Sequence, residues 1–293
     1  MATLRELKGR IGSVASSEKI TGAMKMISSA KMHKAEQALK RLLPYRTLIE
    51  GIIGNLLGSD AEFTSPLTTP REVARLGIVV FGSDDGLCGA YNVNIYKQLL
   101  SHIADLRREI PGVEITVIPV GAKIAKAVSK LAASGAIQMK KASVNSKTEG
   151  DKVREFLDQL IASFNSLELD RVDLLYMNFQ SVSRQRPRFE QLLPLEQSTF
   201  SQNGVTQSFR PCIFEPSAGA IFRSVIPMFM LAVMQEIFTE NRASEQASRV
   251  MAMQSANDNA KKLLDQLRLE YNKLRQQSIT TELLDIVGGQ VRD

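Results

Sequence analysis

Hydrophobic residues near the C-terminus recur at alternating spacings of three and four, the a/d pattern of a helix that pairs with another helix. All members of this set except one asparagine are apolar or aromatic: Val250, Met253, Asn257, Ala260, Leu264, Leu267, Tyr271 and Leu274. The N-terminal part has a matching periodicity at Leu4, Leu7, Ile11 and Val14, and in the same phase at Met32, Ala35, Leu39 and Leu42. The chain is therefore predicted to begin and end in long helices that pair along a coiled-coil seam.

The expected bounds of these helices follow from capping residues and prolines. Thr3 and Glu6 fit a capping box, so the first helix should begin at Thr3. Pro44 should bend or interrupt it, and its pattern ends at Gly58, which predicts an N-terminal coiled-coil helix over residues 1–58. Within residues 216–293, a helical turn after Ser217 should precede a long helix that starts near Pro227 and continues to Gly288.

Between the two helices, residues 75–215 alternate between short apolar runs and amphipathic segments. Strands are expected at 76–81, 113–120, 137–140 and 172–179, and further strands, parallel or antiparallel, at 188–195 and 212–214. Helices are expected at 92–110, 122–133 and 151–164. This order predicts an α/β fold, a Rossmann-like domain with a mainly parallel sheet and helices on both faces.

The C-terminal helix is too long to pack only on this domain. It would contain about 60 residues and extend for about 90 Å, whereas a domain of about 140 residues is about 30 Å across. Its expected partner is the first helix, antiparallel to it, because both helices join the same domain.

The seam of the first helix changes character in its middle. Between the two apolar blocks, the a/d positions hold Glu18, Thr21, Lys25 and Ser28. We therefore expect the phase to slip there, so that Ile20, Met24 and Ile27 replace them. The small residues around Gly22 fit either close helix packing or a smooth surface that turns against a partner.

Charge is concentrated in the first helix. The chain has 37 Lys and Arg against 31 Asp and Glu, a net charge of +6, and residues 1–50 hold ten of the basic residues against four of the acidic ones, which is also +6. This bias fits a solvated helix face, or a face that lies beside nucleic acid, an anionic membrane or acidic protein loops.

Several classes of protein are disfavoured by the composition. Two cysteines, Cys88 and Cys212, and two histidines, His33 and His102, make a disulfide framework or a zinc site improbable. No secretory signal is recognisable, and the longest apolar run, 225–234, is too short to span a bilayer. No carboxylate pair, metal-ligand spacing or nucleophile–base set emerges, which argues against an enzyme.

Two local motifs leave alternatives open. Residues 82–89 form a glycine-rich loop where phosphate loops occur, but the loop lacks both the Walker A and the Gly-x-Gly-x-x-Gly patterns, and Asp84 and Asp85 would repel phosphate. A structural turn is the favoured interpretation, and a nucleotide-binding enzyme with helical arms is the alternative. The basic run Arg184–Arg188 lacks interleaved aromatic residues, so a solvated hairpin or a partner contact is favoured over a nucleic-acid site.

Several motifs, in order along more than 250 residues, resemble the gamma subunits of F-type ATP synthases. The C-terminal signature is carried by Ile279, Thr280, Glu282, Asp285 and Gly289. Other matching segments are 19–26, 86–89, 191–195, 247–249 and 271–276. The sequence departs from the family at Asp85, where Arg or Lys is common, and at Gln290, where Ala is usual.

This resemblance implies a rotor that is not catalytic by itself, the central stalk of a proton-translocating enzyme. It would carry torque between a membrane c-ring and three alpha and three beta subunits, with the epsilon subunit as a further partner. It would bind no nucleotide, cofactor, metal or nucleic acid, and would not span the membrane. Its location would be the cytoplasmic face of the bacterial inner membrane.

The resemblance also implies which residues meet the surrounding subunits. Arg275 and Gln276 would form a catch with loops of beta, and Thr280 and Glu282 lie in the same region. Met24 and Arg249 would lie near an acidic lever loop of beta, which fits the basic bias of the first helix. The alternative interpretation, in which the chain is not a rotor, is a coiled-coil adaptor or a nucleic-acid-binding scaffold that uses the same basic helix.

Overall fold

The computed structural model describes residues 3–57, 65–195 and 214–290. The chain divides into two compact units. The first unit, called the helical unit, comprises residues 1–29 and 249–293, and the second, called the α/β unit, comprises residues 30–248. Helix α1 (Leu4–Leu57) and helix α6 (Ala218–Gln290) each contribute to both units.

The α/β unit is built around a mixed five-stranded sheet with the strand order β3-β2-β1-β4-β5. Strands β1 (Arg75–Phe81), β2 (Glu114–Val120), β3 (Gln138–Met139) and β4 (Arg171–Ser181) are parallel, and β5 (Arg184–Leu193) pairs antiparallel to β4. The predicted α/β class and mainly parallel sheet are confirmed. The basic run begins β5, and its Pro187 is tolerated because β5 is an edge strand.

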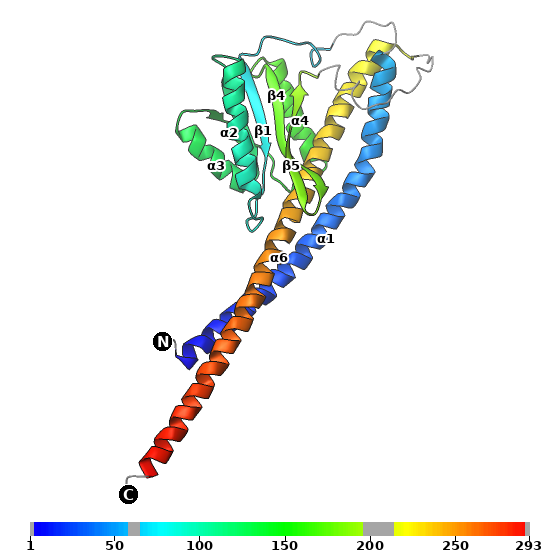
Figure 1. Cartoon of the computed structure of the whole chain (residues 1–293). Coiled ribbons are helices and arrows are strands. Elements are labelled where there is room, and N and C mark those ends of the chain that lie inside the picture. The colour runs from blue at the N-terminus through cyan, green and yellow to red at the C-terminus, as the bar shows by residue number, and fades with distance from the viewer. Residues whose placement is uncertain (1–2, 58–64, 196–213, 291–293) are drawn as a thin grey trace. The chain divides into compact units, whose positions relative to one another are not determined.

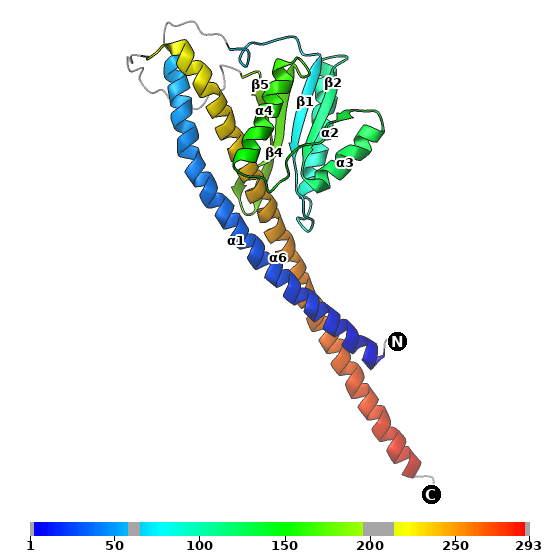
Figure 2. The same cartoon turned by 180° about the vertical axis from the view of Figure 1, so that it is seen from behind.

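Alternating side chains of the sheet point into two apolar cores. On one face, Leu76, Ile78 and Val80 pack with α2 (Tyr91–Glu109) and α3 (Ala122–Ala133). On the other face, Val79 and Phe81 pack with α4 (Asp151–Asn165), the first part of α6 and the last part of α1 (Figures 1 and 2). Burial on both faces explains why β1 is a continuous apolar run.

Both long helices continue through the prolines at which sequence predicted a break. Helix α1 is uninterrupted at Pro44, and α6 begins at Ala218 rather than near Pro227. The backbone amide of Ala220 donates to the Ser217 hydroxyl, which caps the new start. Phe222 and Ile226, upstream of Pro227, are buried in the core of the α/β unit, so packing offsets the hydrogen bond that Pro227 removes from α6.

The apolar composition of α6 has a second consequence. Among the described residues it is the one helix long and apolar enough to cross a membrane, and 56% of its most apolar 18-residue window is buried inside the protein. Burial against the sheet accounts for that composition.

The predicted strand at 212–214 falls largely outside the described residues.

In the helical unit, the α6 seam follows the predicted heptads. Val250, Met253, Asn257, Leu264 and Leu267 are buried, as is Leu7 on α1. The remaining seam residues, Ile11, Val14, Ala260, Tyr271 and Leu274, are half-buried. Figure 1 shows the two segments of this unit running in opposite directions, with α6 extending beyond the N-terminal end of α1.

The expected phase slip in α1 was wrong. Ile20 and Ile27 are 59% and 56% exposed, whereas Ser28 is buried, and Glu18, Thr21 and Lys25 are half-buried. Two polar contacts explain why the a/d phase continues. The Asn257 side-chain amide donates to the Glu18 backbone carbonyl at 2.7 Å and to the Thr21 hydroxyl at 3.3 Å.

These contacts make polar residues acceptable in the seam. A buried asparagine with specific acceptors selects one helix register at some expense of stability. The Thr21 hydroxyl in turn donates to the Ser17 carbonyl at 2.9 Å, so its own hydrogen is satisfied. The middle of the seam is thus held by hydrogen bonds, and three nearby apolar side chains of α1, Ile20, Met26 and Ile27, remain on its outer surface.

A substitution at Gly22 tests how closely α1 and α6 pack in the helical unit. A Cβ atom added at Gly22 would lie 3.3 Å from Nδ2 of Asn257, so Gly22→Leu should separate the helices and destabilise the helical unit by about 1–3 kcal/mol. Hydrogen exchange of the full-length chain measures this, and the amides of residues 4–29 should lose protection.

Gly12→Leu is the matched control, since nothing lies within 4 Å of a Cβ added there. It should leave protection unchanged or raise it, because Leu favours the helix over Gly by about 1 kcal/mol. Equal protection in the two variants would contradict the close packing at Gly22.

Candidate functional site

The glycine-rich loop at residues 82–89 is held together by its own polar side chains. The Asp84 carboxylate accepts hydrogen bonds from the Ala122 amide at 2.9 Å and from the amide and hydroxyl of Ser146 at 2.9 and 2.8 Å. Because Ala122 begins α3, Asp84 occupies a helix N-terminus that could otherwise attract a phosphate. The loop therefore has the geometry of a structural turn, the interpretation that the sequence favoured.

The same loop is tied to α6 by residues that sequence analysis missed. Asn241 is fully buried, and its side-chain amide donates to the Gly82 carbonyl at 3.0 Å. Its Oδ1 accepts from the Tyr91 hydroxyl at 2.6 Å. One turn further, the Ser244 hydroxyl donates to the Met177 carbonyl at 2.8 Å. The sequence gives little signal for these residues, because Asn241 and Ser244 lie in the polar stretch 239–249, where polar side chains are ordinarily exposed.

A cluster of charges joins three elements of the α/β unit. Arg46 of α1 forms ion pairs with Glu50 of α1 at 2.8 Å, Glu236 of α6 at 2.7 Å and Glu190 of β5 at 3.5 Å. Burial would lower the pKa of Arg46, but the charges and hydrogen bonds of these carboxylates raise it above its usual value. Removing the arginine would leave several carboxylates without their main counter-charge.

Glu240 lies beside this cluster on α6 and has a different environment. The Asn178 amide donates to both of its oxygens, at 2.9 and 3.1 Å. Burial raises the pKa of the Glu240 carboxyl to about 7, and the charges of Glu236 and Glu190 act in the same direction, against Asn178 and Arg188. Ionised Glu240 is therefore a source of instability in the α/β unit.

The helical unit presents apolar side chains on its surface. On α1, Ile20, Met26 and Ile27 are exposed, and Met26 is the most exposed at 73%. Toward the C-terminal end of α6, the exposed set comprises Leu269, Ile279, Leu283, Leu284 and Ile286. Ile279, Leu283 and Ile286 have spacings of four and three, so they share one face of α6. An exposed apolar stripe of this kind is typical of an interaction surface. Ile20 and Ile27 could have been found in the sequence as apolar residues outside the a/d phase.

The sequence-predicted contact residues lie in this same unit. Arg275, Gln276, Thr280 and Glu282 are exposed on α6, and the Thr280 hydroxyl donates to the Gln276 carbonyl at 2.9 Å. Arg275 and Glu282 are seven residues apart, so they share a helix face. Met24 on α1 is half-buried.

Arg249 differs from the other predicted contact residues, since only 5% of its surface is exposed. It therefore lies within the protein rather than on its outer surface. The described residues contain no group of three or more His, Cys, Asp or Glu side chains arranged to hold a metal ion.

Comparison with known proteins shows the family. The family profile described as ATP synthase matches residues 3–291. An ATP synthase gamma chain from Bacteroides fragilis is 41% identical and covers 99% of this chain and all of its own length. Gamma chains from Phocaeicola vulgatus and Polynucleobacter asymbioticus are 39% and 33% identical, each over 99% of this chain. The chain belongs to the ATP synthase gamma-chain family.

Solved structures share the fold. A chain in the Euglena gracilis mitochondrial ATP synthase, determined as OSCP/F1/c-ring, superposes with a TM-score of 0.67 at 21% identity, covering 98% of this chain and 93% of that one. A chain of the central stalk/c-ring assembly of the Tetrahymena thermophila mitochondrial enzyme superposes with a TM-score of 0.57 at 21% identity, covering 81% and 99%.

The raised pKa of Glu240 predicts a pH-dependent stability. Because the folded pKa, about 7, lies above the unfolded value of 4.5, stability is lost as pH rises between these values. Glu240→Gln should abolish this loss, and above pH 7 it should stabilise the protein by up to about 3 kcal/mol. Denaturant unfolding of the full chain near pH 5 and near pH 8 measures the difference.

Glu155→Gln on α4 is the control, because Glu155 is exposed and its replacement should have little effect at either pH. A Glu240→Gln protein that is less stable than wild type near pH 8 would show that the ionised carboxylate stabilises the fold.

Proposed function

We propose that this chain is the central rotor of a proton-translocating F-type ATP synthase, and that it carries torque between a membrane c-ring and a ring of three alpha and three beta subunits. Its relatives are named ATP synthase gamma chains, and chains that share its fold belong to structures titled with F1, a c-ring or a central stalk. Rotation of the chain would change which conformation of each beta subunit has the lowest free energy.

One observation carries this proposal: at the polar middle of the seam, large apolar side chains of α1 lie on the outer surface. Glu18, Thr21 and Ser28 face inward, while Ile20 and Ile27 face outward. A helical pair that functioned alone would expose polar side chains and bury apolar ones. The exposure of Ile20 and Ile27 beside polar seam positions is expected if another protein covers this segment, as the alpha–beta ring would.

The C-terminal part of α6 would be the region that enters the ring most deeply. It has no α1 segment beside it beyond the N-terminal end of α1 (Figure 1), and Ile279, Leu283 and Ile286 are exposed there. Arg275 and Gln276 would form a catch with beta loops, with Thr280 and Glu282 in the same contact region. Met24 would lie near the acidic lever loop of beta, and Arg249 would act from within the helical pair.

The remaining assignments belong to the same proposal. The chain would be non-catalytic by itself, and it would lie on the cytoplasmic face of the bacterial inner membrane as part of F1. Residues 1–58 and 216–293 would serve as the coiled-coil helices, and residues 75–215 as the α/β domain that meets epsilon and the c-ring. These partners can be tested by solubilising native membranes gently and pulling down this chain. Recovery of alpha and beta subunits would support the proposal. Recovery of DNA, or a failure to recover alpha and beta subunits, would contradict it.

Arg275 tests the proposed catch. Arg275→Ala should lower the turnover of the assembled enzyme several-fold in both synthesis and hydrolysis, since a lost charged hydrogen bond is worth about 1–3 kcal/mol. Steady-state rates of the assembled complex measure this.

The control is Arg268→Ala, which removes an exposed arginine seven residues earlier on the same face of α6. It should have a much smaller effect. Unchanged turnover in Arg275→Ala, or an equal loss in the two variants, would remove Arg275 from the catch.

Met24 tests the coupling between rotation and chemistry. Met24→Lys adds a cation near the proposed acidic lever, where an attraction would hold the rotor in one position. It should lower the number of protons pumped per ATP hydrolysed while leaving assembly intact, because Lys is tolerated in helices.

Met24→Leu is the matched control, because it conserves side-chain volume without adding charge. Proton pumping in inverted membrane vesicles, divided by the ATP hydrolysis rate, measures coupling. The same ratio in Met24→Lys and Met24→Leu would contradict the assignment of Met24.

A further inference from the structure

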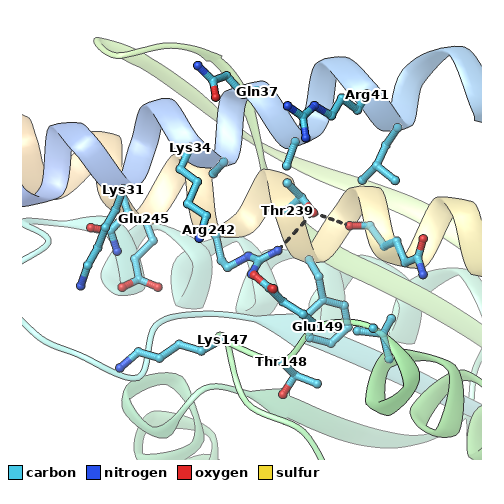
Figure 3. A pocket seen from close by; sticks show the side chains of 18 of the residues that line it. Lys31, Lys34, Gln37, Arg41, Lys147, Thr148, Glu149, Thr239, Arg242 and Glu245 are labelled. Carbon is cyan, nitrogen blue, oxygen red and sulfur yellow. Dashed lines mark hydrogen bonds and ion pairs between the residues drawn. The ribbon is translucent and has the colours of Figure 1, made fainter.

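A pocket of about 690 Å³ lies in the α/β unit between α1, α6 and the loop that precedes α4. Its volume falls within the range of about 300–1,000 Å³ that is usual for small-molecule sites. Figure 3 shows Lys34 extending from α1 toward α6, with Arg242, Thr239 and Glu149 near the middle of the pocket. None of the contact residues assigned above lines it.

The charges that line the pocket are unbalanced. Its five cations are Lys31, Lys34, Arg41, Lys147 and Arg242, and its three carboxylates are Asp85, Glu149 and Glu245. The difference, five minus three, leaves a charge of +2. Lys147 is paired with Asp85 at 2.8 Å and Arg242 with Glu149. The three α1 cations form no ion pair with any described residue.

Arg242 supplies an unused donor. It is half-buried, and the Thr239 hydroxyl accepts from one of its terminal nitrogens at 3.3 Å. Its buried Nε, however, has no hydrogen-bond partner among the described residues. Burial also lowers the pKa of the guanidinium, because the charged form is poorly solvated there. An anion bound in the pocket would accept a hydrogen bond from this Nε and would stabilise the charged form of the guanidinium.

Helix α4 adds a third attraction for an anion. Thr148, Glu149, Gly150 and Val153, around its first turn, line the pocket. The N-cap residue is Gly150, so no side chain caps the helix. An uncapped helix N-terminus favours anions through its amides and its dipole, although the exposed Asp151 of the first turn already provides part of that charge.

The walls are largely apolar beneath these charges. Ala35, Ala38 and Leu42 of α1 and Phe238 of α6 contribute to the lining. A simple inorganic anion would leave this surface unused, whereas an anion with a ring or other apolar body would cover it.

We propose that this pocket binds a phosphate-bearing organic anion of nucleotide size, with its phosphates beside the α1 cations and Arg242 and its apolar body against the α1 wall. This proposal differs from the expectation, implied by the family resemblance, that the chain binds no nucleotide, and it does not depend on the proposed rotor function.

Titration calorimetry of the full-length chain without magnesium tests the proposal, with ATP, inorganic tripolyphosphate, adenosine and a hexaglutamate peptide as probes. ATP should bind with saturation at one site, at least about tenfold more tightly than tripolyphosphate or adenosine. Lack of saturable ATP binding would overturn the proposal. Equal binding of tripolyphosphate would reduce the site to a patch of charge, and tighter binding of the peptide would make it a protein-docking site, so either result also overturns it.

A set of variants locates the site. The triple variant Lys31→Gln, Lys34→Gln and Arg41→Gln should weaken ATP binding at least about tenfold. Arg242→Lys keeps the charge but removes the Nε donor, and should weaken binding several-fold. The control is Lys97→Gln, Lys126→Gln and Lys130→Gln, which removes three exposed charges from α2 and α3. An equal loss of affinity in the control would place ATP elsewhere on the chain.

Discussion

Helix α6 carries the central constraint of this structure, because one continuous helix must bury its surface in two different environments. From Ala218 to Ser248 its buried side chains meet the sheet and the helices of the α/β unit. From Val250 to Leu267 its buried side chains form the heptad seam of the helical unit. Apolar packing alone does not specify a register, so polar contacts at fixed positions do so in each unit.

Those polar contacts differ in kind. In the α/β unit, the buried Asn241 side chain bonds to the Gly82 carbonyl and the Tyr91 hydroxyl, at a place where an unpaired polar group would destabilise the fold. In the helical unit, Asn257 donates to the backbone carbonyl of Glu18 and to Thr21. The first arrangement fixes α6 against the end of the central strand β1, and the second lets the middle of α1 turn its small and polar residues inward.

The inward polar seam has a functional counterpart on the outer surface. Ile20, Met26 and Ile27 on α1 and Ile279, Leu283 and Ile286 on α6 remain exposed in the isolated chain. Separate apolar side chains on helices offer area for contact with few directional bonds. Such a surface suits a proposed rotor, because directional bonds to a surrounding ring would have to break at each step of rotation.

Much of the fold could be predicted from sequence because its elements are strongly periodic. Strand β1 is a continuous apolar run, and helix α3 and the α6 heptads repeat their apolar positions, with Asn257 as the one polar member of the heptad set. The errors occurred where tertiary contacts outweighed local preference: burial of Phe222 and Ile226 extends α6 upstream of Pro227, and Asn257 keeps Glu18 and Thr21 in the seam. In both cases the deciding contacts join segments that are far apart in the sequence. Residues such as Asn241 and the pocket cations were equally hidden, since their meaning depends on which distant segments meet.

The most direct test of the rotor account is single-molecule rotation of this chain in an immobilised alpha–beta ring. A bead attached to a cysteine introduced at exposed Lys126 on α3 would report the orientation of the chain while ATP is hydrolysed. The account predicts rotation in one direction, with pauses at three equivalent angles per turn. Continued ATP hydrolysis by the same complexes with the chain held at a constant angle would contradict it.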